Sequence, residues 1–312
     1  MITVVIPTIG RRSLTRTLAA LGSDTPTIVV DDRPRFCPEL RVPGHVRVLR
    51  TGGRGPAAAR NAGWRAARTR WVAFLDDDVV PQPGWTRDLV TDLAGLPAEV
   101  AGSQGRLIVP LTEGRRPRDA ERDTAGLARA GWVTADMAYR RIALERLGGF
   151  DERFPRPYRE NTDLALRLLR AGYALVKGRR VSHHPARQDS FLTSLRAQKL
   201  NADDALMRHL HGPNWQATIG VPPDHLPHHA TTTALALLTC ALALTAPSHP
   251  KATPAALLTC TAWLTLTAKL TWTRLPPPPH TPEDLLRTTL TSLVIPPLAC
   301  AHRLHGELRA RR

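Results

Sequence analysis

The sequence predicts an α/β protein in which helices flank a mostly parallel central sheet, followed by a helical hydrophobic C-terminal region. Two observations support this fold class. Up to about residue 225, short β-rich runs alternate with amphipathic, arginine-bearing helical stretches, a pattern typical of a parallel sheet covered by helices. From residue 230 to residue 301 the chain is rich in Leu, Ala and Thr and has almost no acidic residues. We therefore expect two parts, residues 1–225 and residues 226–312.

Four short apolar runs predict the strands of the sheet, at residues 2–6, 27–32, 46–50 and 71–75. Apolar residues at helical spacing predict helices over 12–21 and 56–69, and Pro56 suits the first turn of the second helix. In sheets of this kind, ligands bind beyond the carboxyl ends of the strands. The residues that follow each strand are therefore the first candidates for a site.

Polar residues end three of the four predicted strands: Pro7 and Thr8, Asp31 and Asp32, and the triplet Asp76, Asp77 and Asp78. Residues two apart in an extended chain share a face, so Asp76 and Asp78 can point into one site. Neighbouring carboxylates repel each other unless a cation or hydrogen bonds neutralise them. Oxygen ligands suit Mg²⁺ or Mn²⁺, so the triplet predicts a divalent-metal site. The alternative is a capping cluster for a helix that starts near Pro83.

Composition excludes several classes of protein. The formal net charge is +16, but arginines occur in nearly every segment and aromatic residues make up only 5 %, which does not predict a nucleic-acid partner. None of the four cysteines forms a CxxC pair, so we expect neither a disulfide scaffold nor a structural zinc site. The N-terminus has no basic region and only a short apolar run, so we expect no signal peptide and a cytoplasmic main domain.

Two uncharged runs of seventeen residues, 230–246 and 252–268, lie in the C-terminal part. About 17 apolar residues is the lower limit for crossing a bilayer. A third run, 285–301, contains Arg287 and a Pro-Pro pair and suits an interfacial or re-entrant segment. We expect a membrane hairpin or a segment that docks on a membrane surface, at the cytoplasmic face of the cell membrane. The alternative is a buried helical hairpin of a soluble protein.

Six motifs in order give the chain a resemblance to a known family. They are VVIPT (4–8), VVDD (29–32), GPAAARNAGWRAA (55–67), FLDDD (74–78), ADMAYRRIALERLGGFDERF (135–154) and RENTDLALRLLRAGY (159–173). Over about residues 2–185 the sequence resembles the family 2 glycosyltransferases, which are inverting enzymes with the Rossmann-like, nucleotide-sugar-binding fold called GT-A. The resemblance implies a sheet of this type and a sugar nucleotide as substrate.

The resemblance also implies roles for individual residues. Those expected to bind the nucleotide sugar are Pro7, Thr8, Asp31, Asp32, Arg60, Asn61, Asp76 and Asp77. The expected metal ligands, for Mn²⁺ or Mg²⁺, are Asp76, Asp78 and a histidine after the predicted strand YALVKG, for which His183 matches better than its neighbour His184. A divalent cation would stabilise the charge that develops on the departing nucleoside diphosphate. The plainer alternatives are a surface position for Arg60, a turn role for Asp32 and a half-exposed pair of histidines.

The catalytic base is a departure from the family. Inversion needs a carboxylate to take the proton of the attacking hydroxyl, and the family usually supplies the Asp of a Glu-Asp pair. Here the matching pair is Glu160 and Asn161, and an amide is not a base at neutral pH. Glu160 or Asp163 would then be the base, or the alignment is offset, or the protein is catalytically weak or inactive. Asp163 and Asn161 are also ordinary first-turn and N-cap residues of a helix.

Trp132, Asp136 and Met137 lie where the family shapes the donor-sugar and acceptor site, and Trp132 would either stack on a sugar ring or belong to the core. We expect an inverting glycosyltransferase that moves a sugar from a nucleotide-diphosphate donor to a hydroxyl of a cell-envelope or lipid-linked glycan. One alternative is a catalytically degenerate GT-A-fold partner subunit at the membrane. The other is a sugar-phosphate nucleotidyltransferase, for which IPTIGRR (6–12) has too few glycines.

Overall fold

The computed structural model describes residues 2–34, 37–111, 117, 119–186, 190–221, 224–275 and 280–311. The chain divides into two compact units. The first comprises Met1–Pro110 and Asp123–Ala186, and the second comprises Leu111–Arg122 and Arg187–Arg312. Residues 187–225, which composition groups with the sheet, therefore lie in the second unit.

The described residues of the first unit form a mixed sheet of eight strands in the order β3-β2-β1-β4-β7-β6-β8-β5. The strands are β1 (Ile2–Thr8), β2 (Thr27–Asp31), β3 (Arg47–Arg50), β4 (Trp71–Leu75), β5 (Val80–Pro81), β6 (Val100–Ile108), β7 (Asp136–Arg140) and β8 (Ala174–His183). Strands β3, β2, β1 and β4 are parallel, and β6 is parallel to β8. Strand β7 runs antiparallel between β4 and β6, and β5 is antiparallel to β8. The predicted α/β class with a mostly parallel sheet is confirmed.

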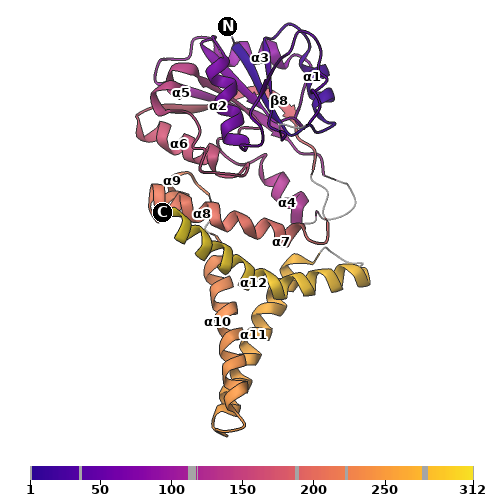
Figure 1. The fold of residues 1–312 in the computed structure, drawn as a ribbon, viewed down its shortest axis with the longest axis vertical. Helices are drawn as coiled ribbons and strands as arrows, with labels where there is room; N and C mark the ends of the chain where they lie inside the picture. The colour runs from indigo at the N-terminus through magenta and orange to yellow at the C-terminus, as the bar shows by residue number, and fades with distance from the viewer. Residues whose placement is uncertain are drawn as a thin grey trace. The chain divides into compact units, whose positions relative to one another are not determined.

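Helices cover both faces of this sheet (Figure 1). The helices of the first unit are α1 (Leu14–Leu21), α2 (Pro56–Ala66), α3 (Trp85–Leu93), α5 (Arg141–Leu147) and α6 (Glu160–Arg170), and α4 (Asp119–Gly126) crosses the boundary between the units. Because side chains alternate along a strand, Val4 and Ile6 pack with α1 and α3, whereas Val5 packs with α2, α5 and α6. The nearly continuous apolar strands β1, β2 and β4 follow from this burial on both faces.

Strand register brings the candidate site residues to one edge of the sheet. Thr8 at the end of β1 pairs with Asp31 at the end of β2. Leu75, the last residue of β4, pairs with Asp136 at the start of β7. The acidic triplet that follows Leu75 therefore begins at the carboxyl edge of the parallel strands, as the sequence predicts.

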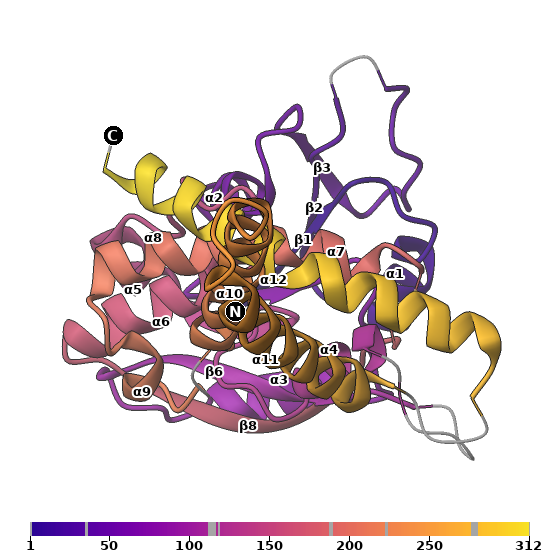
Figure 2. The ribbon, with the colours of Figure 1, turned by 90° about the horizontal axis from the view of Figure 1, so that it is seen from below.

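The second unit is helical. Its elements are α7 (Thr193–Ala197), the 3₁₀ helix η1 (Gln198–Leu200), α8 (Asn201–His211), α9 (Trp215–Thr218), α10 (Leu226–Thr245), α11 (Ala252–Arg274) and α12 (Pro282–Ala310). Helices α10 and α11 form an antiparallel hairpin (Figure 1). Helix α12 packs against α8 and α10, and Figure 2, which looks along α10, shows α12 passing beside it.

The third apolar run, 285–301, lies within a single helix of 29 residues rather than in a broken, re-entrant segment. A capping box starts this helix. The Thr281 hydroxyl accepts a hydrogen bond from the backbone N–H of Asp284, and the Asp284 carboxylate accepts one from the backbone N–H of Thr281. Pro296 and Pro297 lie inside the helix, and Pro296 is buried. Packing of this face therefore compensates for the hydrogen bonds that the two prolines remove.

Among the helices of the described residues, none has both the length and the hydropathy that a membrane crossing needs. The prediction of a membrane-spanning hairpin over 230–246 and 252–268 is therefore not supported. Threonine explains the difference. Hydroxyls such as that of Thr261 bond to the preceding turn, and Thr239 Oγ1 lies 2.9 Å from Thr259 Oγ1 of the neighbouring helix. These polar groups lower the hydropathy of both helices and link them to each other.

Candidate functional site

Two carboxylates and one imidazole converge where β4 and β8 end. Asp76, Asp78 and His184 each offer one ligand atom, and the three atoms lie within 4.8 Å of one another. Asp78 Oδ1 is 3.7 Å from His184 Nε2. The pairing of Val80 with the last residue of β8 brings this histidine to the acidic triplet. Carboxylate oxygens and a neutral imidazole form a donor set suited to a divalent cation.

Local hydrogen bonds separate the roles of the two adjacent histidines. His184 is buried, and its Nδ1 lies 2.9 Å from the carbonyl oxygen of Pro185. A carbonyl only accepts, so Nδ1 carries a proton, and in the neutral imidazole Nε2 keeps its lone pair on the side of Asp78. His183 lies at the end of β8 with its Nε2 2.7 Å from the side chain of Gln82. The structure therefore places His184 beside the carboxylates, whereas the sequence analysis preferred His183.

A buried arginine links two of the predicted site carboxylates. Arg60 of α2 donates to Asp76 Oδ1 at 2.9 Å and to Glu160 Oε1 at 2.7 Å. Burial lowers the pKa of Arg60, but the two carboxylates raise it more, so it stays charged. Burial raises the pKa of Glu160 above its ordinary value, although Arg60 counteracts this. Arg60 is thus an interior group that fixes Asp76 and leaves Asp76 Oδ2 as a possible metal ligand.

The middle residue of the triplet is not part of this cluster and has partners of its own. Asp77 accepts hydrogen bonds from Thr8 Oγ1 at 2.6 Å and from Arg11 at 3.1 Å, and its backbone carbonyl accepts from Thr17. Burial raises the pKa of Asp77, and the bonds from Thr8 and Arg11 oppose this. Asp77 therefore ties β1 and α1 to the triplet. Arg11 also reaches Asp78 Oδ2 at 2.9 Å, which leaves Oδ1 on the side of the histidine.

The acidic pair at the end of β2 has two different environments. Asp31 accepts from Nε and a terminal nitrogen of Arg33, both at 2.8 Å, and these bonds hold the pKa of Asp31 below its ordinary value. Asp32 accepts hydrogen bonds from Thr51 Oγ1 and from the backbone N–H groups of Gly53, Arg54 and Gly55. Asp32 thus organises the loop that opens α2, which is a structural role.

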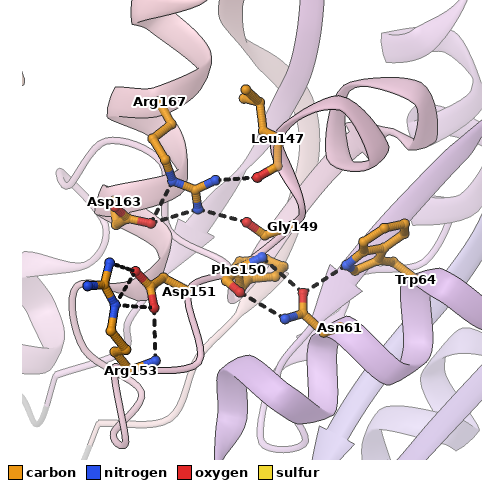
Figure 3. Close-up of polar contacts among 9 residues, drawn as sticks. All are labelled: Asn61, Trp64, Leu147, Gly149, Phe150, Asp151, Arg153, Asp163 and Arg167. Carbon is orange, nitrogen blue, oxygen red and sulfur yellow. Dashed lines mark hydrogen bonds and ion pairs between the residues drawn. The ribbon is translucent and has the colours of Figure 1, made fainter.

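Two further predicted site residues stabilise a turn after α5 (Figure 3). Asn61 accepts from the backbone N–H of Phe150 and donates to its carbonyl, at 2.9 and 2.8 Å. Asp163 accepts from Arg167, which also donates to the carbonyls of Leu147 and Gly149. Gly149 has a φ of 77°, and an added Cβ would lie 2.5 Å from Asn61 Oδ1, so only glycine fits there. Side chains of α2 and α6 therefore bind the backbone of the same turn.

The remaining predicted residues lie on three different elements and have different partners. Asp136 is buried and accepts from Trp85 Nε1, Ser182 Oγ and Arg180 Nε, each at 2.7 Å, so it belongs to the interior. Asn161, at the position of the expected base, donates from Nδ2 to the backbone carbonyl of Trp132 at 2.8 Å. Pro7 and Thr8 lie where β1 ends, beside β2 and the triplet.

Sequence reasoning missed Arg11 and Arg180. Arg11 had one signal, because it follows the first strand in the region where the other site residues gather. Arg180 is fully buried on β8 between Asp92 and Asp136, and nothing in its sequence context distinguishes it from the many other arginines.

Residues 3–148 match the model of a protein family described as Glycosyl transferase family 2. Over these residues, which are just under half of the chain, the sequence is similar to glycosyl transferase family 2. The matched region contains β1 to β7, Arg60 and the acidic triplet. The resemblance predicted from the motifs is confirmed. Glu160 and His184 lie beyond the matched residues of the family 2 domain.

The chain is also similar to curated proteins. It is 34 % identical over 194 residues to the pre-mycofactocin glycosyltransferase of Mycobacterium tuberculosis, which covers 56 % of this chain and 40 % of that protein. It is 34 % identical over 98 residues to the succinoglycan biosynthesis protein ExoO of Rhizobium meliloti, which covers 30 % of this chain and 27 % of that protein. The chain thus spans less than half of the length of these curated relatives.

Among solved structures, the chain resembles the mannosyltransferase PcManGT from Pyrobaculum calidifontis, determined in complex with GDP-Man and Mn²⁺. The TM-score is 0.53 at 21 % sequence identity, over 97 % of this chain and 86 % of that chain. This likeness confirms the GT-A-like fold that was expected for the family 2 domain.

Proposed function

We propose that this protein transfers a sugar, with inversion, from a nucleoside-diphosphate donor to an acceptor hydroxyl. The observation that carries the proposal is the cluster of Asp76, Asp78 and His184 at the carboxyl edge of a family 2 domain. Ligands of α/β sheets bind at this edge. The curated relative is named as a glycosyltransferase, and the solved mannosyltransferase binds a nucleotide sugar.

The cluster fits a divalent cation. Arginines contact Asp76 Oδ1 and Asp78 Oδ2, so the second oxygen of each carboxylate can serve as a ligand together with His184 Nε2. Mn²⁺ is favoured over Mg²⁺ in this proposal because one of the three donors is an imidazole nitrogen. When bound, the cation would stabilise the negative charge that develops on the departing diphosphate.

The other predicted residues have different tasks in this proposal. In this proposal Asp31 accepts a hydrogen bond from the nucleotide base, and Asp76 contacts the ribose. Arg60 keeps Asp76 in place from inside the fold. Asp32, Asp77 and Asn61 have supporting roles, since their hydrogen bonds hold together the segments that border the site. Asp32 binds the loop before α2, Asp77 binds the end of β1, and Asn61 binds the turn after α5.

For the proton acceptor, Glu160 is better supported than Asp163. Arg60 bonds to both Glu160 and Asp76 and so links the two carboxylates. The Oε2 atom of Glu160 is buried without a hydrogen-bond partner in the described part of the chain. Buried unpaired polar atoms are rare and call for a functional or structural explanation. Asp163, by contrast, accepts two hydrogen bonds from Arg167 at its Oδ2 atom. These bonds hold Arg167 in place where it binds the turn after α5. We therefore assign the base to Glu160.

Asn161 favours a second candidate function, a protein that binds nucleotide sugars without transferring the sugar. Release of nucleoside diphosphate separates the two. Purified protein is incubated with Mn²⁺ and a panel that includes GDP-mannose and UDP-glucose, and the GDP or UDP formed is measured. The active proposal predicts release from at least one donor and loss of release in Asp78→Ala, with Asp88→Ala as the control, since the Asp88 side chain is 39 % exposed. Binding without any release, even with acceptor glycans added, would favour the second candidate.

We further propose that the α10–α11 hairpin docks on an anionic membrane surface, which would suit a lipid-linked or cell-envelope acceptor at the cytoplasmic face. Leu244 and Leu258 are 82 % and 73 % exposed, and Trp272 is 76 % exposed. Exposed apolar side chains of this size are typical of interaction surfaces. The net charge of +16 adds attraction to anionic lipid headgroups.

A further inference from the structure

Two amide side chains hold Trp132, in the loop before β7, in an unusual backbone conformation. The φ angle of Trp132 is 62°, in the left-handed region that bulky residues rarely adopt. Gln104 of β6 accepts, at Oε1, hydrogen bonds from the backbone N–H groups of Trp132 and Val133. Asn161 of α6 donates to the Trp132 carbonyl at 2.8 Å. Side chains from two different elements thus bind both backbone polar groups of Trp132.

The hydrogen bonds also fix which way each amide points. Gln104 is buried and donates from Nε2 to the carbonyl of Ala130 at 3.1 Å, so its Oε1 atom faces the N–H groups of the loop. Asn161 meets a carbonyl, which only accepts, so its NH₂ group must face Trp132. An aspartate at position 161, ionised at neutral pH, could not make this bond and would repel the carbonyl.

The Trp132 loop is connected to the metal-binding carboxylates along two routes. The carbonyl of Ala135, three residues further on, accepts the backbone N–H of Asp76 at 3.4 Å. On the other side, Glu160 precedes Asn161 and is joined to Asp76 through Arg60. Trp132 is half-buried and packs in part against the core cluster beneath α2 and α6. Backbone strain that its surroundings maintain in this way is typical of functional sites.

We propose that Asn161 is a positioning residue that holds Trp132 at the sugar-binding part of the site, and not a damaged catalytic base. The inference rests on the proposed function and adds the position of the sugar. In this proposal the flat indole presents an apolar face to the C–H groups of a hexose ring, while Gln104 and Asn161 fix the backbone from which the indole projects. Where the expected aspartate would accept a proton, Asn161 donates a hydrogen bond to the Trp132 carbonyl.

A test without substrate measures the position of Trp132 directly. The protein contains seven tryptophans, which 5-fluorotryptophan labelling resolves by ¹⁹F NMR, and Trp132→Phe assigns the signal. Asn161→Asp should shift the Trp132 signal and leave the other six in place. The matched control is Asn201→Asp, because Asn201 Nδ2 also donates to a carbonyl, that of Gln198, at 3.0 Å. An unshifted Trp132 signal in Asn161→Asp would overturn the proposal.

A kinetic test uses whichever of GDP-mannose and UDP-glucose the wild type hydrolyses. Asn161→Asp should raise KM for the nucleotide sugar about tenfold and leave inhibition by the matching nucleoside diphosphate unchanged, since only the sugar contact is lost. In a Trp132→Gly background the same substitution should add nothing. Equal weakening of both ligands, or a rise in turnover as from a restored base, would contradict the proposal. A wild type that hydrolyses neither donor would count against the proposed function, and the NMR shift would still decide the role of Asn161.

Discussion

The neighbouring histidines show how one step along a strand changes the chemistry of a residue. His183 bonds to Gln82, whereas His184 turns toward Asp78. The sequence favoured His183 over His184, and no local signal could correct this preference, because the choice depends on the pairing of β5 with β8. Nor could it tell that Asp77 bonds to Thr8 and stays outside the cluster of Asp76, Asp78 and His184.

The roles of the other predicted residues depend on their burial and on their hydrogen-bond partners. Both are determined by contacts between residues that are distant in sequence. Asp32 bonds to backbone N–H groups more than twenty residues later, and Asn61 bonds to Phe150 across 89 positions. The motif FLDDD therefore indicated where the candidate site lies, but it could not show which of its acids join the cluster with His184 and which bond to neighbouring strands and helices.

The two candidate bases should respond differently to isosteric substitution. Glu160→Gln removes the proposed proton acceptor, so it should lower kcat at least a hundredfold, in line with the loss of a general base. Asp163→Asn should instead lower the free energy of unfolding, by about 1 to 3 kcal/mol, because it weakens the buried pair with Arg167. Donor turnover and urea unfolding of both variants measure these effects. A larger kcat loss in Asp163→Asn than in Glu160→Gln would reverse the assignment.

Asp31 predicts a pH dependence of stability. Its bonds from Arg33 hold the pKa of this carboxyl below its ordinary value of 3.8, so the native state favours the ionised form. The contribution is therefore fully present above the unfolded pKa and is lost as the pH falls through the folded pKa. Asp31→Asn should cost about 1 kcal/mol at pH 7 and progressively less below pH 4. Urea unfolding at several pH values tests this, with exposed Asp24→Asn as control, and a cost that does not change with pH would contradict it.

At the scale of elements, local patterns predicted most of the first unit. The four strands and two helices expected in residues 2–75 all occur, with boundaries that differ by up to three residues. Their apolar runs and turn residues are local signals. The insertion of antiparallel β7 between β4 and β6 joins segments more than thirty residues apart, so no local pattern reveals it.

Close packing of α8 against α12 predicts a sensitive glycine. A Cβ on Gly306 would lie 2.6 Å from both Cα and the carbonyl oxygen of Ala202, and the backbone cannot move aside easily. Gly306→Ala should therefore lower the free energy of unfolding by roughly 1 to 3 kcal/mol, despite the better helix propensity of alanine. Thermal and chemical unfolding measure the loss. Gly126→Ala is the control, since a Cβ there meets nothing within 4 Å, and equal stability of the two variants would show that α8 and α12 pack less closely.

For the whole molecule, charge and exposed leucines together predict salt-dependent membrane binding. The protein should sediment with vesicles of anionic phospholipid and bind neutral phosphatidylcholine vesicles much less. High salt should weaken this binding. Replacing exposed Leu244 and Leu258 with glutamate should reduce it about tenfold, and the same change at Leu304 on α12 provides a matched control. Equal binding to neutral vesicles, or no effect of the hairpin substitutions, would contradict docking through α10 and α11.

The central claim is that Asp76, Asp78 and His184 together hold a divalent cation. Titration of purified protein with Mn²⁺, followed by the loss of the free-ion EPR signal, measures this without any donor. We expect one site, with at least tenfold weaker binding in His184→Gln and little change in His183→Gln, although the two residues are adjacent. Equal affinity in the wild type and His184→Gln, or a loss confined to His183→Gln, would contradict the account.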